Sequence, residues 1–128
     1  MNNLEVKNYI TEIVEEELYA GSNTIAAGTT SPEAVESGKI RDGYDAVAVS
    51  VAVTRDANCS FWLKINGKQH YPNGLNCSGL GAGQYLNNEV LLGVPLKEGD
   101  SWEIGFTNTS AADVTIAWRF RIRLFKRR

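Results

Sequence analysis

The chain has little of what enzymes and metal sites most often use. It contains one histidine, His70, and its two cysteines, Cys59 and Cys77, lie far apart. Histidine is the commonest general base, and zinc sites need closely spaced cysteine or histidine ligands. The sequence also lacks a nucleophile elbow, a phosphate-binding loop and an EF-hand loop. We therefore expect a protein that is not an enzyme and that holds no metal ion or cofactor.

Long apolar runs are also missing. No segment approaches the ~20 apolar residues that a transmembrane helix needs. The opening MNNLEVKNYI has neither the basic nor the apolar region of a secretion signal. We therefore expect neither membrane insertion nor secretion. Two cysteines are too few for a disulfide scaffold, and whether they pair stays open.

Strict alternation marks the C-terminal segment as a strand with two unlike faces. From Val114 to Leu124 apolar residues occupy every second position, and Arg119, Arg121 and Arg123 lie between them. Side chains of a β-strand point to opposite faces in turn. The segment therefore predicts a long strand with an apolar core face and an arginine face.

Other segments favour strands and turns. The four valines from Val47 to Val53 alternate with small residues, which predicts a central strand whose valines face the core. Asn66-Gly67, between two strand-like runs, predicts a two-residue type I′ hairpin, because both residues tolerate positive φ. Residues 21–45, rich in Gly, Ser, Thr and Ala, predict a short strand around residues 24–27 and then a long loop.

This strand spacing predicts an all-β protein. We expect an antiparallel β-sandwich, jelly-roll-like, formed by residues 21–128 as a single domain. Residues 1–20 are predicted to be an N-terminal arm or a first strand. Within them, residues 4–18 fit either an amphipathic helix or a strand, and their β-branched content favours the extended form.

The arginine face has an acidic counterpart near the start of the chain. Glu15 and Glu17 alternate there as Arg119, Arg121 and Arg123 do near the end, and the net charge is only −2. Because the terminal strands of a sandwich often lie close together, Glu–Arg pairs within one chain or between chains explain both clusters. The alternatives are contact with another acidic protein surface and contact with the phosphates of a nucleic acid, which the near-neutral charge disfavours.

A second candidate site lies in the middle of the chain. Residues 72–88 form a Gly- and Asn-rich loop of the kind that carries binding surfaces. Sugar-binding modules use exposed aromatic rings with amide neighbours, although a structural role for each aromatic residue is the favoured interpretation here. The residues of this carbohydrate- or receptor-binding alternative are Trp62, Tyr71, Asn73, Asn76 and Tyr85.

In its layout the chain resembles a class of virus-particle proteins. An N-terminal segment, MNNLEVKNYITEIVEEELYAGSNTIAAGTT, precedes a β-rich body that contains SFWLKINGKQHYPNG and VPLKEGDSWEIGFTNTSAADVTI. The chain is similar in this to the small, cysteine-poor, single-domain β-sandwich proteins that decorate or cement the capsids of tailed phages. The resemblance lies in the general layout of the whole chain.

This resemblance implies a non-enzymatic homo-oligomer, such as a trimer, that is assembled in the host cytoplasm and located in the virion. It would grip a larger structural protein such as a major capsid protein, with no cofactor, nucleic acid or membrane partner. A small tail or baseplate component is an alternative, beside the sugar-binding module above. The predicted partner-binding residues are Leu4, Val6, Tyr9, Ile10, Ile13, Glu15, Glu17, Arg119, Arg121 and Arg123.

Overall fold

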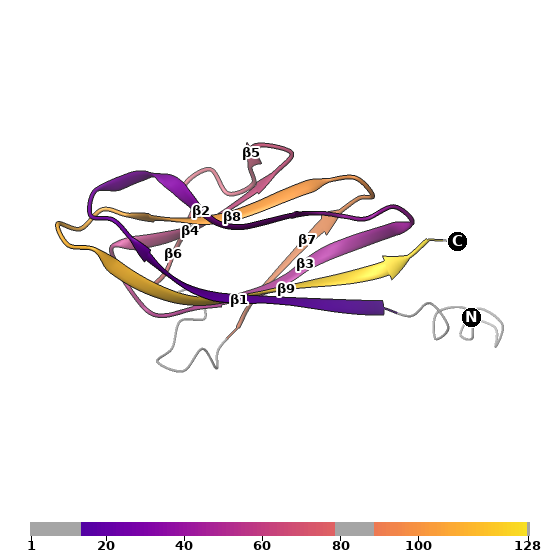
Figure 1. The fold of residues 1–128 in the computed structure, drawn as a ribbon, viewed down its shortest axis with the longest axis horizontal. Coiled ribbons are helices and arrows are strands. Elements are labelled where there is room, and N and C mark those ends of the chain that lie inside the picture. Colours follow the sequence, from indigo (N-terminus) through magenta and orange to yellow (C-terminus); the bar gives the residue numbers. More distant parts are fainter. Residues whose placement is uncertain (1–13, 79–88, 128) are drawn as a thin grey trace.

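A computed structural model describes residues 14–78 and 89–127. In this part of the chain every regular element is a strand, and two antiparallel sheets pack face to face as a β-sandwich, which confirms the predicted fold class (Figure 1). The four-stranded sheet contains, in order, β1 (Val14–Ile25), β9 (Val114–Lys126), β3 (Tyr44–Val53) and β7 (Val90–Leu96). The five-stranded sheet contains β2 (Thr29–Lys39), β8 (Ser101–Asn108), β4 (Cys59–Ile65) and β5 (Lys68–Gln69), and β6 (Leu75–Asn76) also pairs with β4.

The chain crosses between the sheets after most strands. Strands β1, β3, β7 and β9 belong to the four-stranded sheet, whereas β2, β4 and β8 belong to the five-stranded sheet. This repeated crossing wraps the chain around one core in the manner of a jelly roll. As a result β1 and β9, the first and last strands, are hydrogen-bonded neighbours, which brings the acidic and basic segments together.

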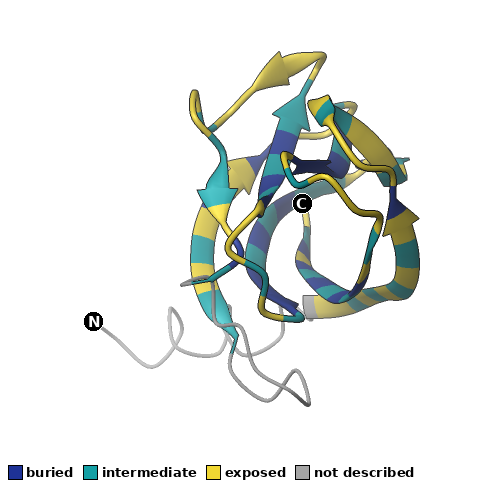
Figure 2. Ribbon diagram, turned by 90° about the vertical axis from the view of Figure 1, so that its left-hand side faces the viewer, coloured by how far each residue is buried: buried dark blue, intermediate teal, exposed yellow. Residues whose placement is uncertain are grey.

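The core fills the space between the sheets, and its centre is aromatic (Figure 2). The ring centroid of Phe61 lies 5.9 Å from that of Phe106 and 6.3 Å from that of Phe120. Trp102 lies 5.2 Å from Phe120 and 4.9 Å from Tyr19. Rings from both sheets therefore interlock, and the apolar area that they remove from water is the main favourable term in folding.

The predicted core face of the last strand is confirmed. The alternating apolar residues of β9 are buried between the sheets, and the arginines point to the opposite side. The outer face of the four-stranded sheet is defined here as the side that carries these arginines. The buried residues are Ile116, Trp118, Phe120, Ile122 and Leu124.

Strand β3 changes face part-way along, which its alternating valines did not predict. Val51 and Val53 are buried as expected, but Val47 is half-buried and Ala48 is fully buried. The register against β9 shifts after Ala48, so that Val49 is the extra residue of a β-bulge. The predicted core face of four valines is therefore wrong before the bulge, since one extra residue reverses the alternation.

The predicted long loop after residue 27 is also wrong, because residues 29–39 form β2. This strand pairs with β8 through two register shifts and contains Pro32. Val35 packs against the core from it. Proline and bulges are typical of edge strands, and they break the period-two pattern by which a strand is recognised in sequence.

Two tryptophans fasten the edge strands β1 and β2 to their neighbours. Gly21 in β1 lies opposite Trp118, and Gly38 in β2 lies opposite Trp102. A Cβ atom added to Gly21 would lie 2.7 Å from the Trp118 indole, and one added to Gly38 would lie 2.6 Å from the Trp102 indole. Glycine is therefore required at both positions, where each indole packs directly on the backbone of an edge strand.

The predicted hairpin is confirmed. Asn66 and Gly67 have φ angles of 53° and 81°, and Ile65 pairs with Lys68 across them. A type I′ turn needs positive φ at both central positions. Asn66 also donates its side-chain amide to the carboxylate of Asp100 at 2.9 Å, which ties the hairpin to the start of β8.

Candidate functional site

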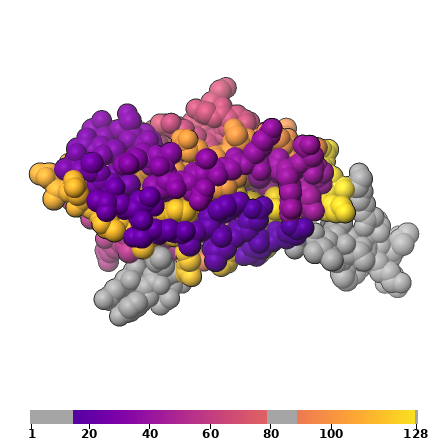
Figure 3. Space-filling model, viewed as in Figure 1, coloured from indigo at the N-terminus to yellow at the C-terminus, as the bar shows by residue number. Residues whose placement is uncertain are grey.

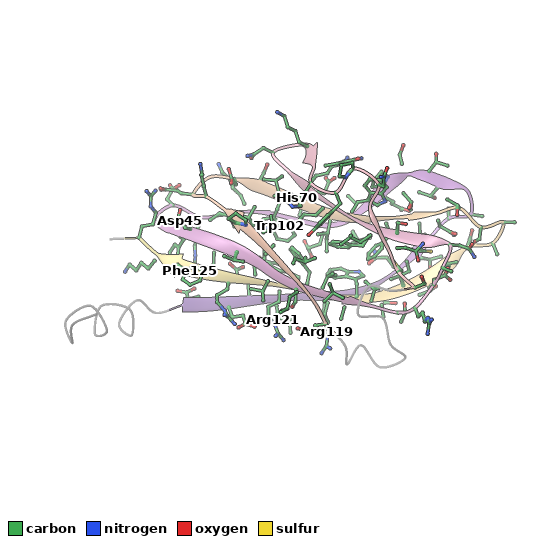
Figure 4. All side chains as sticks on the ribbon, turned by 180° about the vertical axis from the view of Figure 1, so that it is seen from behind. Asp45, His70, Trp102, Arg119, Arg121 and Phe125 are labelled. Carbon is green, nitrogen blue, oxygen red and sulfur yellow. The ribbon has the colours of Figure 1, made fainter. Side chains whose placement is uncertain are left out.

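The outer face of the four-stranded sheet carries the three predicted arginines at its centre. Arg119, Arg121 and Arg123 project from β9, which lies between β1 and β3. Figure 4 shows Arg119 and Arg121 pointing away from the space between the sheets. The structure thus brings these three predicted residues together on the outer face, where their β3 neighbours Ser50 and Ala52 are buried.

Two glutamates hold the arginines from either side of β9. Glu16, from β1, lies 2.6 Å from Nε of Arg121 and 3.5 Å from Nη2 of Arg123. Glu89, just before β7, lies 3.2 Å from Nη1 of Arg121 and 3.8 Å from Nη2 of Arg119. Arg121 is therefore bridged to both edges of the sheet.

This network organises the face more than it stabilises the fold. Its side chains are between 21% and 45% exposed. Ion pairs that water reaches in this way contribute ~0.2–1 kcal/mol each. Glu16 and Glu89 together contact all three guanidinium groups.

The acidic partner of the arginines is not the one predicted. Glu15 and Glu17 lie opposite the core residues Leu124 and Ile122, so both point to the other side of the sheet from the arginines. Glu15 instead accepts hydrogen bonds from the Arg41 guanidinium and from the hydroxyl of Tyr44. Glu17 accepts one from the hydroxyl of Tyr19, whose pKa is raised by burial and by this carboxylate. The predicted Glu–Arg pairing occurs within one chain, but through Glu16.

Two exposed leucines flank the arginines in a single row of the sheet. Leu18 lies opposite Arg121, Arg121 lies opposite Ser50, and Ser50 lies opposite Leu91. Residues that are directly opposite share a face, so the row crosses all four strands on the outer face. Leu18 is 53% exposed and Leu91 is 80% exposed, and they are the exposed large hydrophobic residues of the described chain. Three strand spacings separate their backbones by about 14 Å.

Trp62 and Tyr71, from the predicted sugar-binding set, are half-buried and held by neighbouring groups. The Trp62 indole donates to the hydroxyl of Thr107 at 3.2 Å. Gly74 lies so close to this indole that an added Cβ atom would be 2.7 Å from it. Tyr71 packs against the core, and burial raises the pKa of its hydroxyl, while its ring contacts that of His70 edge-on at 4.6 Å. Both aromatic side chains thus serve to fasten the loop between β5 and β6.

The two amides of this set are both exposed, and Asn76 also holds neighbouring loops together. Asn73 is exposed. Asn76 donates its side-chain amide to the carbonyl of Ala57 at 3.0 Å and accepts from the backbone N–H of Ser78 at 2.9 Å. Asn76 therefore braces two loops against each other.

Six predicted site residues fall outside the described part of the chain. They belong to the N-terminal arm and to the Gly- and Asn-rich loop. They are Leu4, Val6, Tyr9, Ile10, Ile13 and Tyr85.

A groove of about 960 Å³ lies at the end of the four-stranded sheet where β9 ends. Phe125, Asp45 and Glu98 line it together with Arg127. Arg127 lies 2.7 Å from Glu98 and 3.6 Å from Asp45, and the pKa of Glu98 is lowered by the backbone N–H of Gly43 and by Arg127. The charges of Asp45, Glu98 and Arg127 in this groove are thus paired with one another.

The two cysteines are buried and unpaired. They lie side by side, with the N–H of Cys77 donating to the carbonyl of Cys59 at 2.9 Å. Burial raises the pKa of Cys59 to about 11 and that of Cys77 to about 12. Because the thiolate is the reactive form, both side chains act as small apolar core residues at neutral pH.

Metal sites and membrane spans were sought in residues 14–78 and 89–127. No group of His, Cys, Asp and Glu side chains there is arranged to hold a metal ion. No helix in this part of the chain is long and apolar enough to cross a bilayer. The single histidine, His70, is exposed beside Tyr71.

Comparison with known proteins adds no family to this description. No protein-family model matches the chain, and no curated protein matches it. The function must therefore be inferred from the geometry and charge of the surfaces of the molecule.

Four residues of the outer face were missed as site residues in the sequence. Glu16 stands between Glu15 and Glu17, and only the register of β1 against β9 decides which of the three meets the arginines. Glu89 and Leu91 come from the opposite edge of the sheet, far from both termini in sequence. Leu18 continues the alternation of Glu16 along β1, which is the one signal that places it on the arginine side.

Proposed function

We propose that this chain is a non-enzymatic structural protein of a virus particle, which binds a larger structural protein such as a major capsid protein. Its contact surface is the outer face of the four-stranded sheet. The observation that carries this proposal is the row Leu18–Arg121–Ser50–Leu91, in which two exposed leucines flank a fixed arginine. Within the particle the protein acts as a homo-oligomer. Assembly takes place in the host cytoplasm.

The composition of this row favours a protein partner. Interfaces between proteins are enriched in arginine and depleted in lysine, and their strongest contacts combine apolar anchors with desolvated charges. Arg121 is held in place by Glu16 and Glu89, so that little rotamer freedom remains to be lost when a partner binds. Leu18 and Leu91 each present apolar surface that folding has not covered.

The fold is compatible with this function but does not decide it. Jelly rolls occur in viral capsid proteins and also in lectins, and a fold alone does not imply a function. The glycan-binding alternative has less support, because the Trp62 ring is half-buried beside Gly74 and Tyr71 packs against the core.

The test is whether the chain co-sediments with virus particles. Particles from the culture that encodes it are separated on a density gradient, and the chain is detected in the fractions by mass spectrometry. We expect the wild-type chain in the particle fraction. We expect a Leu18→Asp, Leu91→Asp double variant to be lost from that fraction, because charged side chains would have to be buried at the contact.

A matched control separates the outer face from the rest of the surface. Ser31 and Ser37 are exposed on the five-stranded sheet, and a Ser31→Asp, Ser37→Asp double variant adds the same two charges there. This control should stay bound to particles, and both variants should keep the circular dichroism of a β-sandwich. A wild-type chain absent from particles but retained on a glycan array would overturn the proposal, and so would a folded double variant that still binds particles.

A further inference from the structure

Strand β1 is an edge strand without the usual protection. It is hydrogen-bonded to β9 alone in the described part of the chain, through an unbroken register from Val14 to Ile25. It is 12 residues long and contains neither a proline nor a bulge. A long, regular edge strand of this kind is a template for pairing with another strand. Figure 3 shows the indigo atoms of β1 on the surface.

The other edges of the two sheets are blunted. β7 shows a register shift against β3 and contains Gly93, with a φ of 65°, and Pro95. β2 has two register shifts and contains Pro32. β5 and β6 have only two residues each. Proline, bulges and short strands prevent edge pairing, as do charged side chains. β1 is the long edge strand here that lacks the first three, and its charges lie at one end, on Glu15, Glu16 and Glu17.

Half of the backbone groups of β1 point away from β9. Ala117 of β9 accepts a hydrogen bond from the N–H of Thr54 at 2.9 Å and donates its own N–H to the Thr54 hydroxyl at 3.1 Å, so odd-numbered residues of β9 face β3. Backbone direction alternates along a strand, so even-numbered residues of β9 face β1, where they meet its odd-numbered residues. The N–H and C=O groups of Leu18, Ala20 and Ser22 therefore point outward from the edge.

From this edge we infer that the protein forms a two-fold symmetric dimer in which β1 pairs antiparallel with β1 of a second copy. The charge pattern of the strand selects this direction. The acidic residues Glu15, Glu16 and Glu17 occupy one end of β1, and residues 18–25 carry no charge. Parallel pairing would set the acidic ends against each other, whereas antiparallel pairing sets each against the uncharged end of the other copy.

The register follows from the same residues. With Ala20 opposite Ala20 of the second copy, Glu16 faces Thr24 and Leu18 faces Ser22 across the seam. Outward-pointing backbone groups then meet outward-pointing groups, as an antiparallel ladder requires. Ala20 and Ser22 are uncharged, so no like charges meet at or beside the two-fold axis.

Such a dimer joins two four-stranded sheets into one continuous sheet. The side chain of Leu18 stays on the outer face of this continuous sheet, beside Ser22 of the second copy, and Leu91 stays open at the far edge. The inference gives a form to the homo-oligomer of the proposed function, but it does not rest on particle binding. A dimer that ignores virus particles would leave the inference standing, and a monomer that binds them would overturn the inference while particle binding stands.

The first measurement is the mass of the full chain in solution, by light scattering after size exclusion, across a dilution series. We expect twice the 14.1 kDa of one chain at high concentration. Ala20→Pro removes an outward N–H that β9 does not use, and should reduce the mass to that of one chain with an unchanged circular dichroism spectrum. Ala20→Val keeps this N–H and should remain a dimer.

Two further variants keep the inference testable if the proline variant fails to fold. Ala20→Lys places two like charges at the axis and should also give a monomer. Ala20→Cys should form a disulfide-linked dimer under mild oxidation, because residues opposite each other in a ladder lie within disulfide reach, while Thr24→Cys should not. A wild-type monomer at every concentration, a trimer, or a dimer that survives Ala20→Lys would overturn the inference.

Discussion

Strands β1 and β2 follow one another in the chain and both lie at a sheet edge, yet they are built differently (Figure 1). β1 keeps one register against β9 from end to end, whereas β2 shifts twice against β8 and contains Pro32. The two strands nevertheless share one device, a glycine that lies under a tryptophan of the neighbouring strand. Anchoring an edge strand and keeping it regular are therefore separate properties of the sequence.

The difference between the strands concerns what each can still bind. Both are fixed to the sandwich by an indole, Trp118 over β1 and Trp102 over β2. The irregular strand closes its edge against further pairing, while the regular strand leaves its edge open. The outer face with its arginines lies on the sheet that has the open edge.

The largest expected effect comes from replacing the glycine that lies under a tryptophan in each of the two strands. Gly21→Ala and Gly38→Ala each force a methyl group to within 3 Å of an indole ring, and each should lower the free energy of unfolding by about 1–3 kcal/mol. Urea denaturation of the two variants measures this loss. Ser37→Ala, an exposed neighbour in β2, should change stability by less than about 0.5 kcal/mol. A glycine variant as stable as this control would show that the indole moves aside.

Regular strands can be predicted from the sequence better than irregular strands. β9 and the Asn66-Gly67 hairpin were predicted because one period, or one turn type, fixes them locally. β2 was missed because its bulges and Pro32 erase the period, and the face of Val47 was wrong because a bulge lies inside β3. Local patterns carry no information about such register shifts, which arise from pairing with strands distant in sequence.

The candidate site was predictable to the same extent. The arginines were found because alternation places them on one face of one strand. The pairing with Glu16 was missed because it depends on the register between the first and last strands, and Glu89 was missed because it depends on the order of strands in the sheet. The half-buried ring of Trp62 likewise depends on Gly74, which returns to it from a different turn.

A smaller expected effect is the pH dependence of stability, to which one group in β1 and one group in the core contribute. β1 carries Tyr19, whose pKa is raised by burial and by Glu17, and the core holds Cys77, whose pKa rises from 9.0 to about 12. Between pH 9 and pH 12 the unfolded chain loses the Cys77 proton while the folded chain keeps it. Stability from this group is therefore complete below pH 9 and falls as the pH rises, by up to about 1.4 kcal/mol per pH unit.

Urea denaturation at pH 8, 9, 10 and 11 under reducing conditions measures this slope. Cys77→Ala should reduce it from pH 9 upward and leave the part that Cys59 contributes. Tyr19→Phe should flatten it only above about pH 10, where an unfolded tyrosine ionises. A free energy of unfolding that stays constant from pH 8 to pH 10 in the wild-type chain would contradict the assignment of a protonated, buried thiol.

The smallest expected effect concerns which glutamate of β1 serves the arginines. Glu16→Gln removes the ion pairs with Arg121 and Arg123, and it should cost about 1 kcal/mol or less at low salt. The cost should shrink in 1 M salt, where charges are screened within about 3 Å. Glu17→Gln keeps an oxygen that can accept from Tyr19 and breaks no ion pair with the outer-face arginines, so it should respond far less to salt. In a double-mutant cycle Arg121→Gln should couple to Glu16→Gln and not to Glu17→Gln, because only Glu16 shares the outer face with it. Coupling to Glu17 instead would mean that β1 is displaced by one residue, which would also turn Leu18 into the core.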